Sequence, residues 1–243
     1  MFRKIFGILL TFILISYTSD VYGSENTLKT LTSADSLFEK KQYTESMELY
    51  ERFLHAGFYT PRMLIRLSLI KEGLGDYTYA LYYLNLYYAK IPDKSVLKKM
   101  DELAARYNLE GYDYNDLVFF ISLYDQYYTY IIIAFLSASA LFLLYLYVKR
   151  REKKGMGLRP LLFMFILGAV YIISNYNIIP SKAIINSDAS LMSAPSAGAE
   201  LIGQINKGHR VTIQGKDDIW CKIKWHDKTA YVRENNLLFV DSK

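Results

Sequence analysis

The residues of this chain best suited to nucleophilic or metal chemistry are one cysteine, Cys221, and three histidines, His55, His209 and His226. A nucleophilic cysteine needs a histidine partner, and no known motif surrounds these histidines. None of the three has the spacing to another His, Cys or carboxylate that a metal site requires. Cys221 lies in the run WCKIKW, whose apolar–polar alternation predicts a strand. The expected role of this thiol is therefore that of a small buried hydrophobic group.

The motifs of common enzyme classes are also missing from the sequence, which contains no GxSxG, Walker loop, HExxH or paired acidic pattern. We therefore expect a protein that is not an enzyme, with no catalytic residues, no cofactor and no metal. A transporter would place charged side chains inside its spans. The two long apolar stretches of this chain contain none, which argues against a channel or carrier.

Those two stretches, residues 129–148 and 160–179, predict a pair of transmembrane helices. About 20 apolar residues are needed to cross the hydrocarbon core of a bilayer. Tyrosines gather at both ends of the first stretch, as interfacial aromatic residues do. A buried helical hairpin in a soluble protein is the alternative, but so basic a turn between such long uncharged runs is unusual there.

The connecting loop, residues 149–159, holds six Lys or Arg residues and one acid. Short basic loops stay in the cytoplasm, so both flanking regions are expected on the other side of the membrane. Residues 1–23 look like a secretory signal peptide, which agrees with this orientation. The net charge of +5 is concentrated in the cytoplasmic loop. The basicity therefore reflects topology and does not indicate nucleic-acid binding.

Before the membrane, residues 24–110 contain an internal repeat. Five positions recur at an offset of 34 residues: Tyr43 and Tyr77, Ser46 and Ala80, Met47 and Leu81, Tyr50 and Leu84, Phe53 and Tyr87. Small residues at Ser46 and Ala80 would let paired helices approach closely, and Pro92 would end the second helix. A third, degenerate pair is expected, beginning near Ser95 and continuing through an amphipathic helix at 111–128 into the first span.

The period and the Gly75-Asp76-Tyr77 turn resemble the tetratricopeptide repeat (TPR) family. An unrelated pair of helical hairpins is the alternative. The resemblance implies an α-helical solenoid whose first helices line a concave peptide-binding face. By correspondence with the family pattern, that face would include Arg62, Ile65, Leu69 and Glu72 in the second copy, and Leu28, Leu31, Asp35 and Phe38 in the first. These positions could equally form a solvated or inter-repeat surface.

After the membrane, residues 182–243 consist of short β-rich runs separated by Gly, Asn and Asp. In the run RVTIQ, Val211 and Ile213 face one side and Thr212 and Gln214 the other. The order of Leu191, Pro195, Gly208, Trp220 and Val232 resembles bacterial SH3-type (SH3b) domains, although Met192 and the pair Ala230-Tyr231 depart from their pattern. The resemblance implies a barrel of five or six strands that binds cell-wall peptides or protein segments.

Trp220 and Tyr231 are the candidate ligand-binding residues of this SH3b-like domain. Core or inter-strand packing is the alternative role for both aromatic side chains. The predicted fold class is thus multidomain α and β, with an α-helical TPR solenoid, a two-helix transmembrane hairpin and a small all-β SH3-like barrel.

The whole layout resembles the BatE-type proteins of the Bacteroides aerotolerance operon. That resemblance implies a location in the bacterial inner membrane. It also implies partnership with von Willebrand A (VWA) domain membrane proteins and, indirectly, a MoxR-type AAA+ ATPase. Two functions follow as hypotheses. The chain could be a membrane-anchored scaffold that gathers envelope proteins, with possible roles in stress, or a cell-wall sensor whose SH3b domain binds peptidoglycan peptides.

Overall fold

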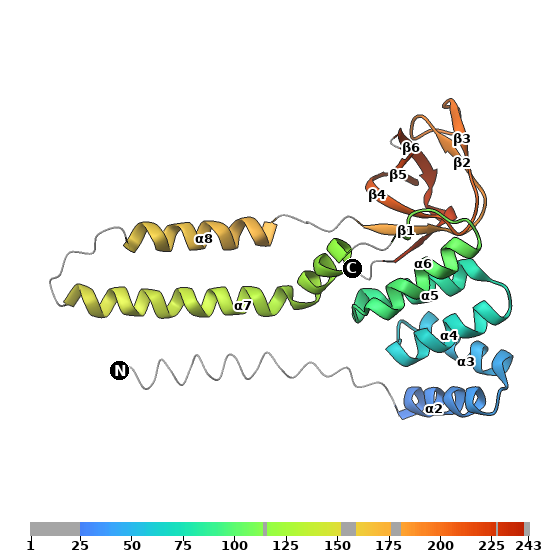
Figure 1. Cartoon of the computed structure of the whole chain (residues 1–243), viewed down its shortest axis with the longest axis horizontal. Helices are drawn as coiled ribbons and strands as arrows, with labels where there is room; N and C mark the ends of the chain where they lie inside the picture. The colour runs from blue at the N-terminus through green and yellow to red at the C-terminus, as the bar shows by residue number, and fades with distance from the viewer. Residues whose placement is uncertain (1–24, 114–115, 152–158, 176–180, 227, 241–243) are drawn as a thin grey trace. The chain divides into compact units, whose positions relative to one another are not determined.

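The computed structural model describes residues 25–113, 116–151, 159–175, 181–226 and 228–240. The predicted signal peptide and most of the basic loop lie outside these residues. The chain divides into two compact units, Met1–Tyr59 and Thr60–Lys243, which are described in turn. The elements are labelled in Figure 1.

The first unit is a pair of helices, α2 (Glu25–Glu39) and α3 (Tyr43–His55). Ser46 and Tyr50 on α3 are fully buried. The Ser46 hydroxyl donates to the Ala34 carbonyl oxygen at 2.8 Å, and the Tyr50 hydroxyl donates to Asp35 Oδ1 at 2.6 Å. The small side chain at Ser46 therefore sits where the two helices meet, as the repeat pattern predicts.

The second unit begins with α4 (Pro61–Gly73), α5 (Tyr77–Lys90) and α6 (Lys94–Arg106). Each has a side-chain N-cap: Thr60, Asp76 and Asp93 accept backbone N–H groups of the first turn. Gly75 adopts a φ of 75° in the turn between α4 and α5. Ala80 is fully buried. A helical N-terminal region is thus confirmed, while its assignment to the TPR family stays a prediction.

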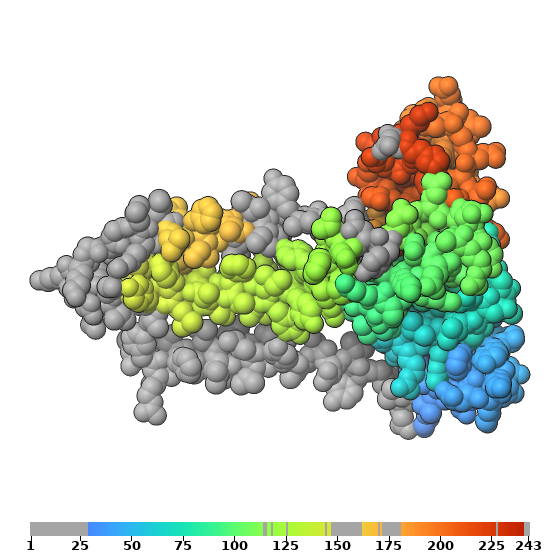
Figure 2. All heavy atoms as spheres, in the orientation of Figure 1, coloured from blue at the N-terminus to red at the C-terminus, as the bar shows by residue number. Residues whose placement is uncertain are grey.

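The next helix, α7 (Asp116–Arg151), is 36 residues long, which corresponds to about 54 Å at the usual rise per residue. By length and composition, its segment Gln126–Leu143 could cross a membrane, and no other described helix meets both criteria. Large apolar side chains on α7 are exposed, including Leu136 and Leu141. The atoms of α7 can be followed in Figure 2 by their yellow-green colour. This segment falls within the first predicted span, apart from its first three residues.

The helix α8 (Arg159–Asn175) corresponds to the second predicted span. Its 17 described residues pack beside α7, with the rings of Phe142 and Phe163 stacked at 6.0 Å. Residues 176–179 of that predicted span lie outside the described residues. The structure therefore identifies one candidate membrane helix, and the second span stays a prediction.

The C-terminal region is a seven-stranded antiparallel sheet in the order β3-β2-β6-β5-β4-β1-β7. The strands are β1 (Lys182–Ile185), β2 (Ala189–Met192), β3 (Leu201–Ile205), β4 (Arg210–Asp217), β5 (Trp220–Trp225), β6 (Lys228–Arg233) and β7 (Leu237–Phe239). A bulge between Ile213 and Gly215 interrupts the register of β4 with β5. The described sheet has more strands than the predicted five or six, because β1 and the short β7 pair at its end.

The β domain has its own apolar core, built from alternating residues such as Val211, Cys221, Ile223 and Val232. A second core belongs to α5 and α6 and includes two residues of the β domain, Ile184 and Val240. Leu238 of β7 packs against that second core as well. Within the second unit, the β domain is therefore joined directly to the helical region that precedes the membrane helix.

Candidate binding pocket and its helical support

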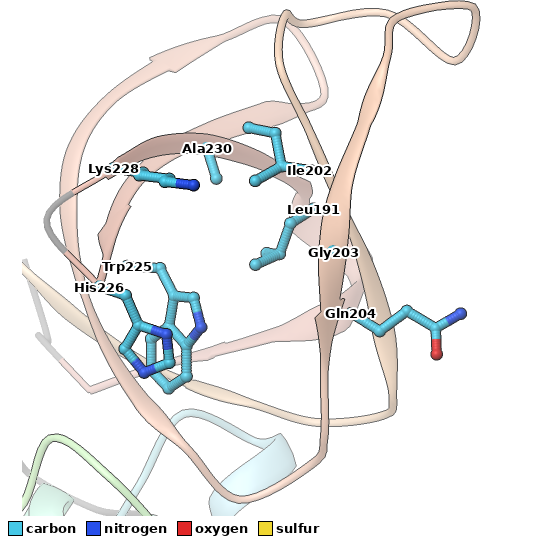
Figure 3. Close-up of a pocket in the computed structure, with 8 residues that line it drawn as sticks. All are labelled: Leu191, Ile202, Gly203, Gln204, Trp225, His226, Lys228 and Ala230. Carbon is cyan, nitrogen blue, oxygen red and sulfur yellow. The ribbon is translucent and has the colours of Figure 1, made fainter.

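A pocket of about 220 Å³ opens between the β2–β3 and β5–β6 hairpins. Its lining residues are Leu191 from β2; Ile202, Gly203 and Gln204 from β3; Trp225 and His226 at the end of β5; and Lys228 and Ala230 from β6. Leu191 and Ala230 are buried and form apolar lining, while Lys228 is exposed. In Figure 3 the Lys228 amine points into the hollow, whereas the side chain of Gln204 points away from it.

The pocket thus combines an apolar interior, an aromatic ring and a cation. None of its described lining residues is acidic. Small-molecule sites are usually about 300–1,000 Å³. A volume of about 220 Å³ is better suited to one side chain or a short fragment of a larger ligand. The chemistry favours an apolar group with a carboxylate beside it.

Trp225 is flanked by two histidines. Its ring lies 5.1 Å from the His209 ring in edge geometry and 4.6 Å from that of His226. His226 adopts a φ of 45°, in the left-handed region where side chains are uncommon. This turn conformation brings the His226 ring to the pocket wall.

Both histidines contact one residue of the loop that follows α6, Glu110. The Glu110 backbone N–H donates to His209 Nδ1 at 3.0 Å, and a Glu110 carboxylate oxygen lies 2.8 Å from His226 Nε2. Burial lowers the pKa of His209, while nearby Glu110 raises it and His226 lowers it further. His209 therefore favours the neutral form, whose Nδ1 is free to accept the backbone hydrogen bond.

A buried arginine lies next to this contact. Arg210 on β4 is 8% exposed. Its Nε donates to the Gly111 carbonyl oxygen at 2.7 Å, and its Nη1 donates to Asn85 Oδ1 at 2.9 Å. The guanidinium stacks 4.6 Å from the centre of the Tyr112 ring, and the Tyr112 hydroxyl donates to the Gly208 carbonyl oxygen at 2.8 Å. Burial lowers the pKa of Arg210, while Tyr112 and Asp113 raise it.

The backbone at this contact is close enough to require glycine. Gly111 has a φ of 90°, and a Cβ added there would lie 2.0 Å from the Arg210 carbonyl oxygen. Gly208 has a φ of 94°, and a Cβ there would lie 2.9 Å from the Tyr77 ring. The β domain therefore packs closely against the start of α5 and against the residues that follow α6.

The two SH3b site residues predicted from sequence lie outside this pocket. Trp220 is 8% exposed, and the Arg233 guanidinium lies 5.4 Å from its ring centre. Tyr231 is half-buried on β6, opposite Lys222 of β5 and Met192 of β2. Neither lines the Trp225 pocket. Their role in ligand binding stays a prediction, and the burial of Trp220 favours packing.

The predicted concave-face residues of the helical region differ in exposure. Arg62 is exposed, and Leu69 is 51% exposed. Ile65 packs against the core of α5 and α6. Glu72 is half-buried and accepts from Lys99 Nζ at 2.8 Å, with Arg106 3.6 Å away. The structure therefore leaves Arg62 and Leu69 as the accessible pair on α4.

In the first unit, Phe38 is half-buried and meets the Tyr43 ring edge-on at 5.3 Å. Leu31 is half-buried, and Asp35 is occupied by the Tyr50 hydroxyl. The side chain of Leu28 lies outside the described residues. These positions also remain predictions as binding residues.

In the described part of the chain, the cysteine and the histidines do not come together in a catalytic or metal site. Cys221 is a fully buried free thiol, and burial raises its pKa, which disfavours the reactive thiolate. Among the described residues, no cluster of three His, Cys, Asp or Glu side chains could hold a metal ion.

Residues 187–237 match the family model of the bacterial SH3 domain. This match confirms the SH3b prediction for the C-terminal region, which is therefore a bacterial SH3 domain. It covers well under half of the 243 residues. No curated protein matches the chain. The match supports neither the TPR assignment nor the aerotolerance resemblance.

Sequence reasoning missed the pocket residues Trp225, His226 and Lys228, although one signal was available. Trp220 and Trp225 are five positions apart in a strand, so period-2 alternation directs them to opposite faces. Trp225 shares its face with Cys221 and Ile223, which lies toward the core. The short turn after Trp225 then carries the polar side chains to the rim of the pocket.

Proposed function

We propose that this protein is a membrane-anchored scaffold of the bacterial cell envelope that binds protein partners through its helical region and its SH3 domain. The bacterial SH3 domain supports a binding role. The observation that carries the proposal is the shared core of α5, α6, β1 and β7, because it fixes two binding-type regions in one body. Two weak contacts made by one chain add through a high effective concentration.

In the proposed topology, α7 and α8 both cross the inner membrane. The basic loop of residues 149–159 faces the cytoplasm, and the helical region and SH3 domain face the periplasm. The apolar, exposed segment Gln126–Leu143 supports the first crossing. The second crossing rests on the composition of residues 160–179.

The proposed partners are envelope proteins. By architectural resemblance they include VWA-domain membrane proteins and, through them, a cytoplasmic MoxR-type ATPase in a stress-related complex. The exposed Arg62 and Leu69 on α4 are the positions best placed to contact a partner in the helical region.

Cross-linking of the tagged full-length protein in intact cells, followed by mass spectrometry, tests this proposal. We expect envelope proteins to be recovered by the parent protein and lost from a variant with Arg62→Glu and Leu69→Glu. Lys40→Glu, another exposed charge reversal, is the control and should retain them. Identical recovery from all three proteins would contradict a scaffold that uses this surface.

The alternative function is a cell-wall sensor whose SH3 domain binds peptidoglycan peptides. The specific observation in its favour is the Trp225 pocket, where an aromatic ring and Lys228 could receive a short peptide with a carboxylate. Retention of the detergent-solubilised full-length protein on purified peptidoglycan, abolished by Trp225→Ala, would favour the sensor. Failure to be retained would leave the scaffold as the better explanation.

A further inference from the structure

The sheet of the SH3 domain has two terminal strands that differ in their surroundings. At one end, β7 contributes Leu238 to the packing against the helical core. At the other end, β3 pairs only with β2 among the described strands. An edge strand carries backbone groups that can pair with another chain. The β3 edge is therefore the open end of this sheet.

The β3 edge is also unusually apolar for an open edge. Leu201 is 55% exposed, and Ile202 is 38% exposed. Edge strands that stay uncovered usually carry charges or proline, which prevent unwanted pairing. No charged residue and no proline lies within Leu201–Ile205. This composition favours an edge that is covered by a partner.

The pocket lies directly beside this edge, since Ile202, Gly203 and Gln204 of β3 form one of its walls. Ile202 and Leu191 lie across the opening from Trp225 (Figure 3). A peptide strand added along β3 could place one side chain in this hollow. Main-chain hydrogen bonds would then provide affinity, and the pocket would select the side chain.

Charge complementarity indicates which side chains such a segment carries. Lys228 and His226 are polar lining residues, and no described lining residue is an acid. An acidic residue next to an apolar one would place its carboxylate near the Lys228 ammonium while the apolar group enters the hollow. A neighbouring carboxylate would also compete with Glu110 for His226 Nε2.

We propose that the β3 edge and the Trp225 pocket bind an extended segment of a protein partner by strand addition, with an apolar side chain in the pocket and an acidic residue at Lys228. This inference rests on the proposed scaffold function and names the chemistry of one partner contact. We favour a protein segment over a wall peptide, because D-residues interrupt a regular ladder with an L-residue strand.

The test uses the full-length protein in nanodiscs and a phage-displayed library of random linear heptapeptides. We expect enrichment of peptides that pair an apolar residue with Asp or Glu. Affinity for the selected peptide should fall roughly tenfold or more in Lys228→Glu and in Ile202→Lys. Lys40→Glu, the matched charge reversal outside the SH3 domain, should bind like the parent protein.

Amide hydrogen exchange with the selected peptide then separates strand addition from simple pocket filling. Strand addition predicts slower exchange across residues 201–205. Enriched peptides that leave these amides unprotected would overturn the inference. It would also be overturned if the parent protein enriched no peptides beyond those that the Lys228→Glu variant enriches. Purified muropeptides that bind the pocket more tightly than any selected peptide would also overturn it.

These results remain distinguishable from a failure of the scaffold proposal. Loss of envelope partners in the Arg62→Glu, Leu69→Glu variant concerns α4 and does not depend on β3. If that experiment succeeds while the peptide experiment fails, the scaffold stands and the β3 contact is rejected.

Discussion

Arg210 Nη1 in β4 donates to Asn85 Oδ1 in α5 at 2.9 Å, which joins two side chains 125 positions apart in the chain. Both side chains are buried. Asn85 also donates from Nδ2 to the Leu81 carbonyl oxygen at 2.8 Å, so its orientation is set within its own helix. The pair places a buried cation where the SH3 domain meets the helical region.

Replacing Arg210 with Met should lower the free energy of unfolding by about 2–4 kcal/mol, because Asn85 Oδ1 and the Gly111 carbonyl lose a buried donor. Asn85→Leu should cost a similar amount. The double variant should cost less than the sum, since neither partner is then left alone. Denaturant unfolding followed by tryptophan fluorescence measures all three.

Arg233→Met is the control for this cycle, because Arg233 is exposed and lies over the Trp220 ring without a role at the interface. Its cost should stay below about 1 kcal/mol. Strict additivity of the Arg210 and Asn85 changes would show that the hydrogen bond does not couple the two regions.

A second prediction concerns Gly111. Gly111→Ala adds a methyl group 2.0 Å from the Arg210 carbonyl oxygen. Gly75→Ala introduces a similar strain, because Gly75 has a φ of 75° and Gly111 has a φ of 90°. The methyl group added at residue 75, however, has no atom within 4 Å. We expect Gly111→Ala to be the more destabilising by at least about 1–3 kcal/mol. Equal melting temperatures for the two variants would mean that the SH3 domain is not held against residue 111.

The His209 contact predicts a dependence of stability on pH. Burial lowers the pKa of His209 in the folded protein below its unfolded value of 6.5. The unfolded chain therefore binds more protons between the two pKa values, and stability falls as the pH drops from about 6.5 toward the folded pKa. His209→Asn retains a hydrogen-bond acceptor near the position of Nδ1 but cannot titrate. The unfolding free energy of this variant should therefore lack the part of the pH dependence that comes from His209. An unchanged pH profile in that variant would assign the dependence to other groups.

The small residue at Ala80 predicts close packing of α4 and α5. Ala80 is fully buried, so Ala80→Leu should destabilise the protein by about 1–3 kcal/mol through overpacking. Ala89→Leu on the exposed surface of the same helix should change stability by less than about 0.5 kcal/mol. Thermal unfolding of both variants provides the comparison, and an unchanged stability in Ala80→Leu would argue against close packing of α4 and α5 at this position.

The proposed topology predicts the accessibility of two introduced cysteines. Ser187→Cys lies at an exposed position after β1 and should react with a membrane-impermeant maleimide once the outer membrane is permeable. Lys154→Cys in the basic loop should react only after lysis. Cys221 is buried and should contribute little background. Equal labelling of both cysteines when the outer membrane is permeable and the inner membrane is intact would contradict two crossings.

Much of the secondary structure followed from the sequence, because it depends on local signals. Thr60 and Asp76 cap helices, and Gly75 turns the chain between two of them. Alternation within β4 and β5 indicated strands, and the order of residues such as Gly208 and Trp220 resembled the bacterial SH3 domain found at 187–237. These features need only neighbouring residues, so periodicity and turn chemistry reveal them.

The packing of the helical region against the SH3 domain could not be predicted from the sequence. Arg210 resembled any polar residue beginning a strand, and Glu110 resembled any loop acid. Their roles depend on contacts across about 100 positions, between Glu110 and His209 and between Gly111 and Arg210. No local pattern encodes such pairs.

The binding pocket shows the same division. The sequence by itself indicated a helical N-terminal region, long apolar stretches and an SH3-type β domain, because periodicity, turn residues and the order of a motif are all local features of the chain. Only the tertiary structure decided that Trp225 faces β3 across a pocket and that Lys228 points into the hollow, since two separate hairpins must pack before those residues meet. Burial of Trp220 was decided in the same way, by neighbours that the chain brings from other strands.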